Sequence, residues 1–188
     1  SNDVETKPEL RALLRGTDKN RPTESDSTNR DNFVLAMRAA VTGVNLVTTD
    51  GPGGRFGLTV SAMCSVSADP PMLLVCISQK NPIRSAIEFN RVFCMNVLAT
   101  GQDRLARIFA GAAEQGAAYD FDAGTWERGV TDAPRLAHAT ASFDCHVENI
   151  YSAGSHSIFI GRVATAVSRE ATPLLYTNQH YGIPLTFE

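Results

Sequence analysis

The sequence predicts a mainly β protein, an antiparallel barrel with flanking helices packed against its outside. Short apolar runs rich in β-branched residues recur along the chain and are separated by turn-forming residues. Only two or three segments show the apolar spacing of a helix. Because these helices and strands do not alternate regularly, the pattern disfavours a doubly wound, dinucleotide-binding sheet.

The N-terminal segment differs in composition from the remainder of the chain. Residues 1–30 are rich in charged and hydroxyl side chains and poor in large apolar ones, so we expect a flexible N-terminal arm there. The folded domain is expected over 31–188. It begins with a helix for which Asp31 is a suitable N-cap and which Gly43 ends.

The strands are predicted from apolar runs that Gly, Pro, Asp or Asn residues bound. They are expected at 44–49, 56–63, 72–78, 92–98, 139–150, 157–168 and 174–176. The first two form a hairpin around the turn at 50–54. Residues 111–136 are expected to be mostly loop because glycine recurs in them.

Two further helices follow from local signals. Pro82 suits the first position of one helix, and its inner face is expected to carry Ile83, Ile87 and Phe89. The second helix is predicted over 102–110, where apolar residues again recur at helical spacing.

Composition excludes several classes of function. The net charge is −3 and the pI is about 5.8, so no nucleic acid and no anionic membrane is expected as a partner. No apolar run approaches the ~20 residues of a membrane span, and no signal-peptide pattern is present. We therefore expect a cytoplasmic protein.

Cysteine and histidine spacing predicts no metal site. The cysteines form no Cys-x-x-Cys pair and lie in apolar, strand-like runs, so we expect reduced cysteines in the core. They are Cys64, Cys76, Cys94 and Cys145. No two histidines are spaced as i and i+4, as a helical zinc site requires.

The glycine-rich segment 51–57 resembles a dinucleotide-binding loop only superficially. Phe56 takes the place of the third glycine of G-x-G-x-x-G, and a strand rather than a helix follows. We interpret this segment as a hairpin turn.

Small hydroxyl residues then recur at every second or fourth position. If 56–67 were one strand, Thr59, Ser61, Ser65 and Ser67 would share a face. The row is either the solvent side of an edge strand or a set of short donors beside a polar, planar ligand, and periodicity alone slightly favours the solvent side.

Two connections offer ligand-binding groups. Asn81 and Ser85 stand at a strand-to-helix junction that suits a phosphate, although an ordinary helix cap has the same pattern. His156 follows a Gly-Ser turn and is either a turn residue or a ligand contact at the barrel mouth. No nucleophile elbow or paired carboxylates are found. From these residues alone, the sequence indicates a β-barrel domain for a phosphate-bearing ligand.

Taken in order, the motifs resemble the short-chain flavin reductase family, the reductase partners of two-component flavin-dependent monooxygenases. The resemblance covers about residues 33 to 185. It is carried by the following runs: 41–44, 47–49, 57–61, 65–71, Asn81 and Ser85, 93–98, Leu105 and Ala106, 109–111, 154–156, 160–163, 173–176 and Tyr181.

The resemblance implies a split β-barrel of the FMN-binding, flavin-reductase type that works as a homodimer. It implies hydride transfer from NADH or NADPH to FAD or FMN, and delivery of reduced flavin to a flavin-dependent monooxygenase component. Because the cofactors carry the reactivity, the absence of a catalytic triad is expected.

The resemblance also implies roles for particular residues. The flavin ring would lie along Thr59, Val60, Ser61, Ala62 and Met63, with Ser65, Ser67, Asn81 and Ser85 toward the ribityl chain and phosphate. Phe109, Ala110 and Gly111 match a loop that closes over the flavin, and His156 and Tyr181 match nicotinamide contacts. His156 is the one catalytic candidate. The chain departs from the family at Ser155, where an aspartate is usual, and at Ala62, where a serine is frequent.

Two alternatives remain on the same fold. One is a flavin-binding protein without enzymatic activity. The other is a different oxidase, such as one that acts on a pyridoxal-type phosphate.

Overall fold

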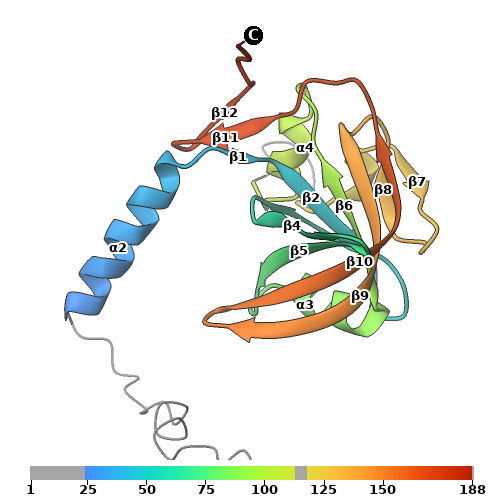
Figure 1. The fold of residues 1–188 in the computed structure, drawn as a ribbon, viewed down its shortest axis with the longest axis horizontal. Coiled ribbons are helices and arrows are strands. Elements are labelled where there is room, and N and C mark those ends of the chain that lie inside the picture. Colours follow the sequence, from blue (N-terminus) through green and yellow to red (C-terminus); the bar gives the residue numbers. More distant parts are fainter. Residues whose placement is uncertain (1–23, 113–117, 188) are drawn as a thin grey trace, which may run out of the picture. The chain divides into compact units, whose positions relative to one another are not determined.

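The computed structural model describes residues 24–112 and 118–187. The chain divides into two compact units, one ending at Met37 and the other beginning at Arg38. The helix α2 (Glu24–Ala39) crosses this division, and the other described elements all belong to the second unit (Figure 1).

The helix α2 begins earlier than the sequence predicts. It starts at Glu24 rather than at Asp31, so 24–30 is helical although we expected it within the flexible arm. Neither Pro nor Gly occurs in 24–30, and nothing there interrupts a helix. The helix ends at Ala39, before Gly43. The remainder of the expected arm, 1–23, lies outside the described residues.

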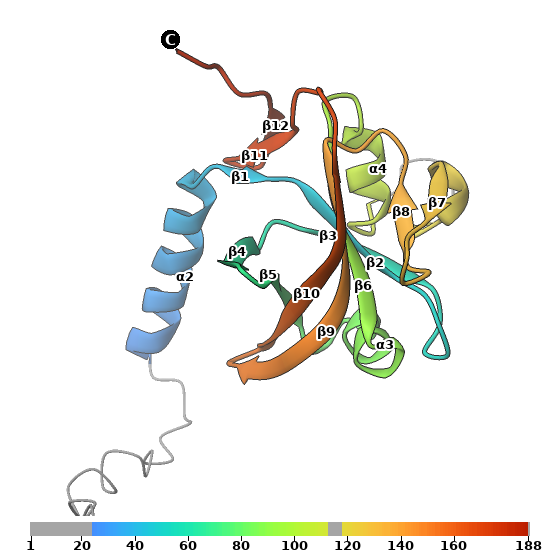
Figure 2. The same ribbon diagram turned by 45° about the vertical axis from the view of Figure 1, so that its right-hand side comes forward.

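One antiparallel sheet forms most of the second unit (Figures 1 and 2). Its strands, in spatial order, are β3 (Phe56–Val60), β2 (Asn45–Thr49), β6 (Val92–Val97), β9 (Ala141–Ala153), β10 (His156–Ser168), β5 (Pro71–Ser78) and β4 (Met63–Ala68). Every neighbouring pair is antiparallel. The mainly β class is therefore confirmed, and each strand predicted from the sequence lies in or overlaps an observed one.

The sheet is open between its two edge strands, β3 and β4. The described residues contain no ladder between these strands, although only Ser61 and Ala62 separate them in the sequence. The chain crosses at this point from one sheet edge to the other, and the Cys76 N–H donates to the Ala62 carbonyl at 3.2 Å. The single strand predicted over 56–63 is therefore two strands, and the antiparallel barrel is split along one side.

Smaller elements complete the second unit. The minor sheets join β1 (Thr42–Gly43) to β11 (Leu175–Thr177) and β12 (His180–Gly182), and β7 (Trp126–Arg128) to β8 (Pro134–Leu136). The helices are α3 (Pro82–Asn90), α4 (Asp103–Ile108) and the 3₁₀ turn η1 (Phe121–Ala123). The segment predicted as loop over 111–136 thus contains a short hairpin. None of the helices in the described ranges is long and apolar enough to span a membrane.

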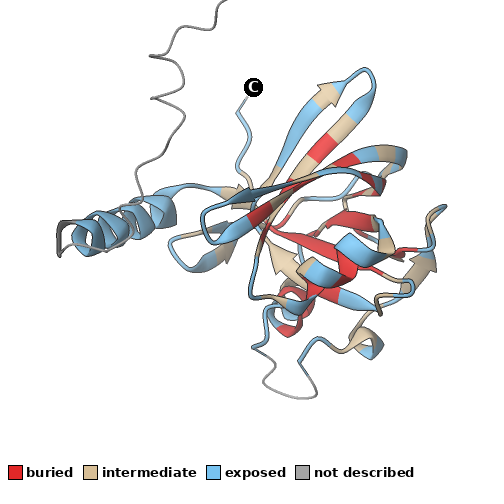
Figure 3. Cartoon of the chain, turned by 90° about the horizontal axis from the view of Figure 1, so that it is seen from below, coloured by how far each residue is buried: buried red, intermediate tan, exposed pale blue. Residues whose placement is uncertain are grey.

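The core consists of two apolar clusters on opposite sides of β2. Val47 belongs to the cluster that α3 covers, and Leu46 belongs to the cluster with α4. All residues of β2 are buried, which explains why Leu46–Thr49 show no alternation of apolar and charged residues. Figure 3 shows the buried residues gathered in the middle strands, with the β9–β10 hairpin tip exposed.

The helix α3 forms where the sequence places it, with one error. The Asn81 Oδ1 accepts the Ile83 N–H at 3.1 Å, as in an N-cap. Ile83 and Ile87 are buried, but Phe89 is 68% exposed. It lies six positions after Ile83, off the face that i, i+3 and i+4 residues share.

All four cysteines are free thiols, and two of them are core residues as predicted. Cys94 and Cys145 are buried, whereas Cys64 is exposed on the edge strand β4 and Cys76 is only half-buried. The expectation that all four lie in the core is therefore wrong for Cys64, because an edge strand has one neighbour instead of two.

Candidate functional site

The end of β3 forms one wall of a pocket that gathers several of the residues singled out in the sequence. We call it the β3–β11 pocket. Its volume is about 230 Å³, and its lining residues are Gly43, Val44, Thr59, Val60, Ser61, Ala110, Tyr176 and Tyr181. This pocket therefore brings together residues that we predicted to contact the flavin, namely Thr59, Val60, Ser61 and Ala110. It also contains Tyr181, which we predicted to contact the nicotinamide.

Thr59 lies in this pocket, but its polar groups already have partners. Its backbone N–H donates to the Phe109 carbonyl at 2.9 Å, and its Oγ1 donates to the Ala106 carbonyl at 2.7 Å. These two bonds fix the edge strand β3 against the end of α4. Thr59 therefore positions the pocket wall, and Ser61, which is exposed, is the free hydroxyl beside it.

An aromatic cluster supports this wall from behind. The Phe109 ring is fully buried, and its centroid lies 5.1 Å from that of Phe121 and 5.8 Å from that of Trp126. The Trp126 indole N–H donates to the Phe121 carbonyl at 2.7 Å. Of the predicted loop 109–111, only Ala110 lines the β3–β11 pocket. The Phe109 side chain belongs to the core instead.

Tyr181 and Tyr176 form the opposite, aromatic side of the pocket. Their ring centroids are 5.2 Å apart, and the Arg107 guanidinium lies 5.3 Å from the Tyr181 centroid. Burial is the main cause that raises the pKa of the Tyr181 phenol. At neutral pH the hydroxyl therefore stays protonated and is available as a hydrogen-bond donor, next to ring faces on which a planar ligand can stack.

A second pocket lies at the other end of β3. This β3–α3 pocket has a volume of about 270 Å³ and is lined by Arg55, Phe56, Gly57, Asn81, Pro82 and Tyr119. Asn81, for which the sequence analysis expected a place near a phosphate, is one of its lining residues. Ser85 is exposed within α3 and is not part of the lining.

The remaining hydroxyls of the predicted row face a third, largely apolar pocket. This β4–β5 pocket measures about 190 Å³ and contains Met63, Ser65 and Ser67 together with Met72 and Phe143. The expectation that positions 59, 61, 65 and 67 share one face is wrong. It required one straight strand, whereas the chain turns at 61–62 and a register shift follows between Ser65 and Ser67.

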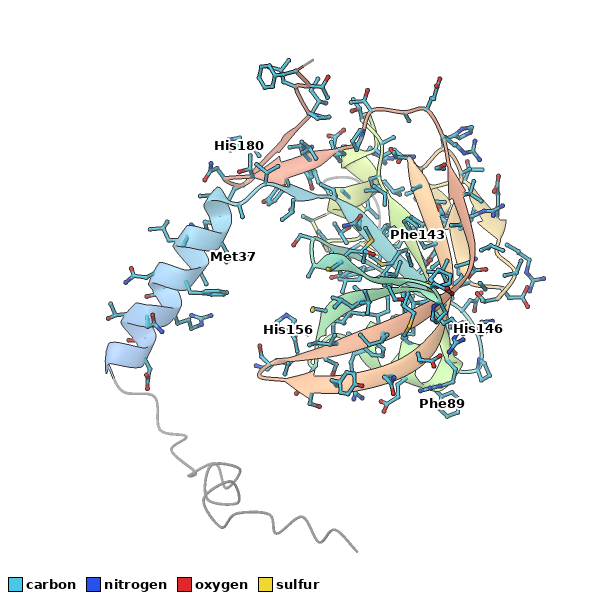
Figure 4. All side chains as sticks on the ribbon, in the orientation of Figure 1. Met37, Phe89, Phe143, His146, His156 and His180 are labelled. Carbon is cyan, nitrogen blue, oxygen red and sulfur yellow. The ribbon has the colours of Figure 1, made fainter. Side chains whose placement is uncertain are left out.

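His156 lies at the tip of the β9–β10 hairpin, away from Tyr181. Its backbone carbonyl accepts the Gln79 side-chain N–H at 3.1 Å, so the hairpin tip adjoins the junction before α3. The Ser155 Oγ lies 2.9 Å from the His156 Nδ1. Figure 4 shows His156 well separated from His180, the neighbour of Tyr181. Within one chain, the two predicted nicotinamide residues are therefore on different hairpins.

Arg55, Tyr119 and Tyr176 are among the lining residues to which the sequence analysis gave no role. Arg55 stands in the glycine-rich segment that we interpreted only as a turn, and its charge beside two glycines was the available signal. Tyr119 carries no local signal. Tyr176 lies in the run 173–176 that supports the family resemblance, but nothing in that run predicts that its side chain lines a pocket.

The chain is similar to known proteins over most of its length. Residues 37–183 match the family model described as "Flavin reductase like domain". The chain is 43% identical over 147 residues to "FMN reductase (NADH) RutF" of Variovorax paradoxus (strain S110), covering 78% of this chain and 81% of that protein.

Solved structures show the same fold. One is the Streptomyces globisporus C-1027 NADH:FAD oxidoreductase SgcE6 in complex with NAD and FAD fragments, with a TM-score of 0.75, 29% identity and coverage of 84% of this chain and 93% of that one. Another is the styrene monooxygenase flavin reductase (SMOB) from Pseudomonas putida S12, with a TM-score of 0.73, 25% identity and coverage of 83% and 99%. The family match over residues 37–183 and the 43% identity to the Variovorax paradoxus relative show that the chain belongs to the flavin reductase-like domain family.

Proposed function

We propose that this chain is an NAD(P)H-dependent flavin reductase that transfers hydride from a reduced nicotinamide to FAD or FMN. The observation that carries the proposal is the β3–β11 pocket, in which the end of an edge strand and Ser61 line one space together with Tyr176 and Tyr181. The relative from Variovorax paradoxus, named as an NADH-dependent FMN reductase, supports it.

The residues of the pocket fit a flavin ring. An isoalloxazine needs a narrow slot with flat walls and N–H donors at its pyrimidine edge. The strand β3 ends at Val60 and β4 begins at Met63, so the backbone N–H groups of Ser61 and Ala62 lie outside both strand ladders. The bound flavin would accept the hydride, and it would supply the reactivity. The chain's own groups would orient the two rings and place donors where negative charge develops.

We propose the following assignments. Thr59, Val60, Ser61, Ala62 and Met63 lie along the ring, with Ala110 closing over it. Ser65, Ser67, Asn81 and Ser85 serve the ribityl and phosphate side, and His156 and Tyr181 serve the nicotinamide. The placement of Thr59, Ser61, Ala110 and Tyr181 in one pocket supports this. Residues 31–188 would form the reductase domain.

We also propose a homodimer that supplies reduced flavin to a flavin-dependent monooxygenase. The structural relative SMOB carries a monooxygenase in its name, which supports such a client. A cytoplasmic location is consistent with four free thiols, since reducing compartments keep cysteines in that state.

Anaerobic flavin bleaching tests the activity. Purified protein is mixed with FMN or FAD and then with NADH or NADPH, and the absorbance of oxidised flavin is followed. The proposal expects bleaching with at least one pair of cofactors, at a rate that rises with protein concentration. Flavin binding without turnover for all four pairs would instead indicate the non-enzymatic alternative.

A further inference from the structure

We propose that Gln79 and Arg84 are positioning residues that hold His156, at the tip of the β9–β10 hairpin, in place for the nicotinamide. The inference rests on the proposed function, because it takes His156 to be a nicotinamide contact. Gln79 follows the last residue of β5, and Arg84 lies in the first turn of α3. Both residues therefore act on the hairpin from a different part of the chain.

The main sheet gives the hairpin tip little support. The strand β6 pairs with β9 only as far as His146. Over 148–153, β9 has β10 as its one neighbour in the described ladders. On the other side, the ladder between β5 and β10 ends at the pair Ser78 and His156. His156 thus lies where the ladder stops, next to the turn at the free end of the hairpin (Figure 1).

Gln79 binds two consecutive residues of the tip. Its backbone N–H donates to the Ser155 carbonyl at 3.0 Å. Its side-chain Nε2 donates to the His156 carbonyl at 3.1 Å. Together these bonds extend the contact between β5 and β10 beyond the end of their ladder. The backbone that carries the His156 ring is therefore fixed by one residue from outside the hairpin.

Arg84 binds the residue that follows His156. Its Nε donates to the Ser157 Oγ at 3.3 Å, and Ser157 is fully buried. The Arg84 Nη1 forms an ion pair with Glu88, one turn further along α3, which orients the guanidinium. Because this charged donor reaches a hydroxyl that is shielded from water, the bond ties the base of the tip to α3.

The orientation of the His156 ring depends on these backbone anchors. The Ser155 Oγ lies 2.9 Å from the His156 Nδ1, and in the described part of the chain the ring has no other hydrogen-bond partner. Both residues of this contact have the carbonyls that Gln79 binds. A shift of the tip therefore moves the free Nε2. Hydride transfer requires the two reacting rings within about 3–3.5 Å, so a misplaced nicotinamide contact weakens productive binding.

Steady-state kinetics with riboflavin as the acceptor test the inference. Riboflavin has no phosphate, so no effect can arise from the phosphate side of a flavin nucleotide. Gln79→Met and Arg84→Met remove the donors and keep long side chains. We expect each to raise the KM for NADH roughly three- to ten-fold, the effect of losing one hydrogen bond. The kcat should change little, and the Kd of riboflavin, from fluorescence titration without nicotinamide, should stay the same.

Two matched variants control for the loss of charge. Arg84→Lys keeps a charged donor for Ser157 and should retain most of the wild-type KM. Arg128→Met removes an arginine that also pairs with a carboxylate four positions later, Asp132, but whose side chain is 82% exposed. It should change neither the KM for NADH nor the Kd of riboflavin.

A double-mutant cycle shows whether the effect passes through the histidine. In a His156→Ala background, Gln79→Met and Arg84→Met should raise the KM for NADH no further, because coupled residues are not additive. Nuclear magnetic resonance gives a second readout that needs no turnover. The imidazole signal of His156, assigned by its absence from His156→Ala, should shift or broaden in both anchor variants and stay unchanged in Arg128→Met.

The outcomes separate the inference from the function. Wild-type KM values in Gln79→Met and Arg84→Met would overturn the positioning role while the reductase proposal stands. Weaker riboflavin binding, or a rise in KM that persists in the His156→Ala background, would also overturn it, because the effect would not pass through His156. Failure of the wild-type chain to oxidise NADH with any flavin would contradict the proposed function itself, whereas the imidazole signal decides independently whether the two residues hold the ring.

Discussion

At Gly57 the edge strand β3 lies directly against the Phe109 ring. A Cβ at this position would stand 2.6 Å from the Phe109 Cε1 and 3.3 Å from the Phe121 Cζ, so a larger residue must displace the ring. Phe109 also accepts the Thr59 N–H. The glycine thus permits the close approach on which the pocket wall depends.

We predict that Gly57→Ala lowers the free energy of unfolding by about 1–3 kcal/mol, as overpacking of a core does. It should also weaken flavin binding, because the Phe109 carbonyl moves with its ring. Chemical denaturation and flavin titration measure the two effects. Gly182→Ala is the control, since a Cβ there meets nothing within 4 Å. Equal effects of both substitutions would contradict the role of Gly57.

His156 can be tested through the nicotinamide. The Ser155 Oγ contacts its Nδ1 and orients the ring, which leaves Nε2 for a ligand. We predict that His156→Ala raises the KM for NADH roughly three- to ten-fold, the effect of losing one hydrogen bond. The exposed His146 on β9 offers a matched control, His146→Ala, with no effect expected. An unchanged KM for His156→Ala would remove this residue from the nicotinamide site.

At the scale of elements, the β7–β8 hairpin is attached to the main sheet through buried polar groups. The Asn96 Oδ1 accepts the Leu136 N–H at 2.8 Å, and the Thr48 Oγ1 donates to the Pro134 carbonyl at 2.5 Å. The Asp144 carboxylate, which is 1% exposed, accepts the Thr131 N–H at 2.9 Å and the Thr131 hydroxyl. Trp126, which lies on β7, packs against the Phe109 ring.

We predict that Asp144→Ala destabilises this hairpin before the rest of the sheet. The substitution leaves a part-buried N–H of Thr131 unpaired, which costs about 1–3 kcal/mol. Hydrogen exchange should accelerate first at the amides of β7 and β8. Asp122→Ala, in the exposed turn η1 of the same segment, should not change the exchange pattern. Uniform acceleration across all strands would show that Asp144 does not act locally.

The elements found from the sequence are those with local signals. The strand β2 is apolar or β-branched from Leu46 to Thr49, and α3 has Asn81, Pro82 and a clear inner face. The hairpin β7–β8 was not predicted, because the residues that hold it in place are distant in sequence. Asn96, for example, accepts the N–H of Leu136, which lies 40 positions away. The break in the strand expected over 56–63 was not predicted. The periodicity of a strand contains no information on whether the chain moves from one edge of the sheet to the other.

For the molecule as a whole, the candidate site could be predicted only in part. The resemblance identified Thr59, Ser61, Ala110 and Tyr181, and the structure places all four in one pocket. It did not identify Arg55. In the β3–α3 pocket, Arg55 from the β2–β3 turn and Tyr119 from the segment after α4 become neighbours. Residue spacing along the chain contains no information about such contacts.

Buried thiols give the whole fold a predictable response to alkali. Burial first, and then the charge of Asp144, raise the pKa of the Cys145 thiol to about 12 from an ordinary value of 9.0. Burial raises the pKa of Cys94 as well. The unfolded chain therefore loses these protons at a lower pH than the folded chain. The stability that they contribute is complete below pH 9 and declines as the pH rises toward the folded values.

We predict that the free energy of unfolding falls between about pH 9 and pH 11 and that Cys145→Ala makes this fall shallower. Urea denaturation at a series of pH values measures how steeply the free energy of unfolding falls with pH. The smaller alanine side chain also lowers the free energy of unfolding, but it does so equally at every pH and leaves this slope unchanged. Cys64→Ala, at an exposed position, should leave the slope unchanged. The same slope in all three proteins would contradict the assignment to Cys145.

The aromatic cluster behind the pocket has a spectroscopic consequence. Trp126 is the only tryptophan of the chain, and it contacts Phe109, whose backbone fixes the pocket wall. Oxidised flavins absorb where indoles emit, so a flavin in the pocket would receive excitation energy from this single donor. The chain therefore contains its own optical reporter, whose emission should dim as flavin binds and recover when the flavin is bleached or released.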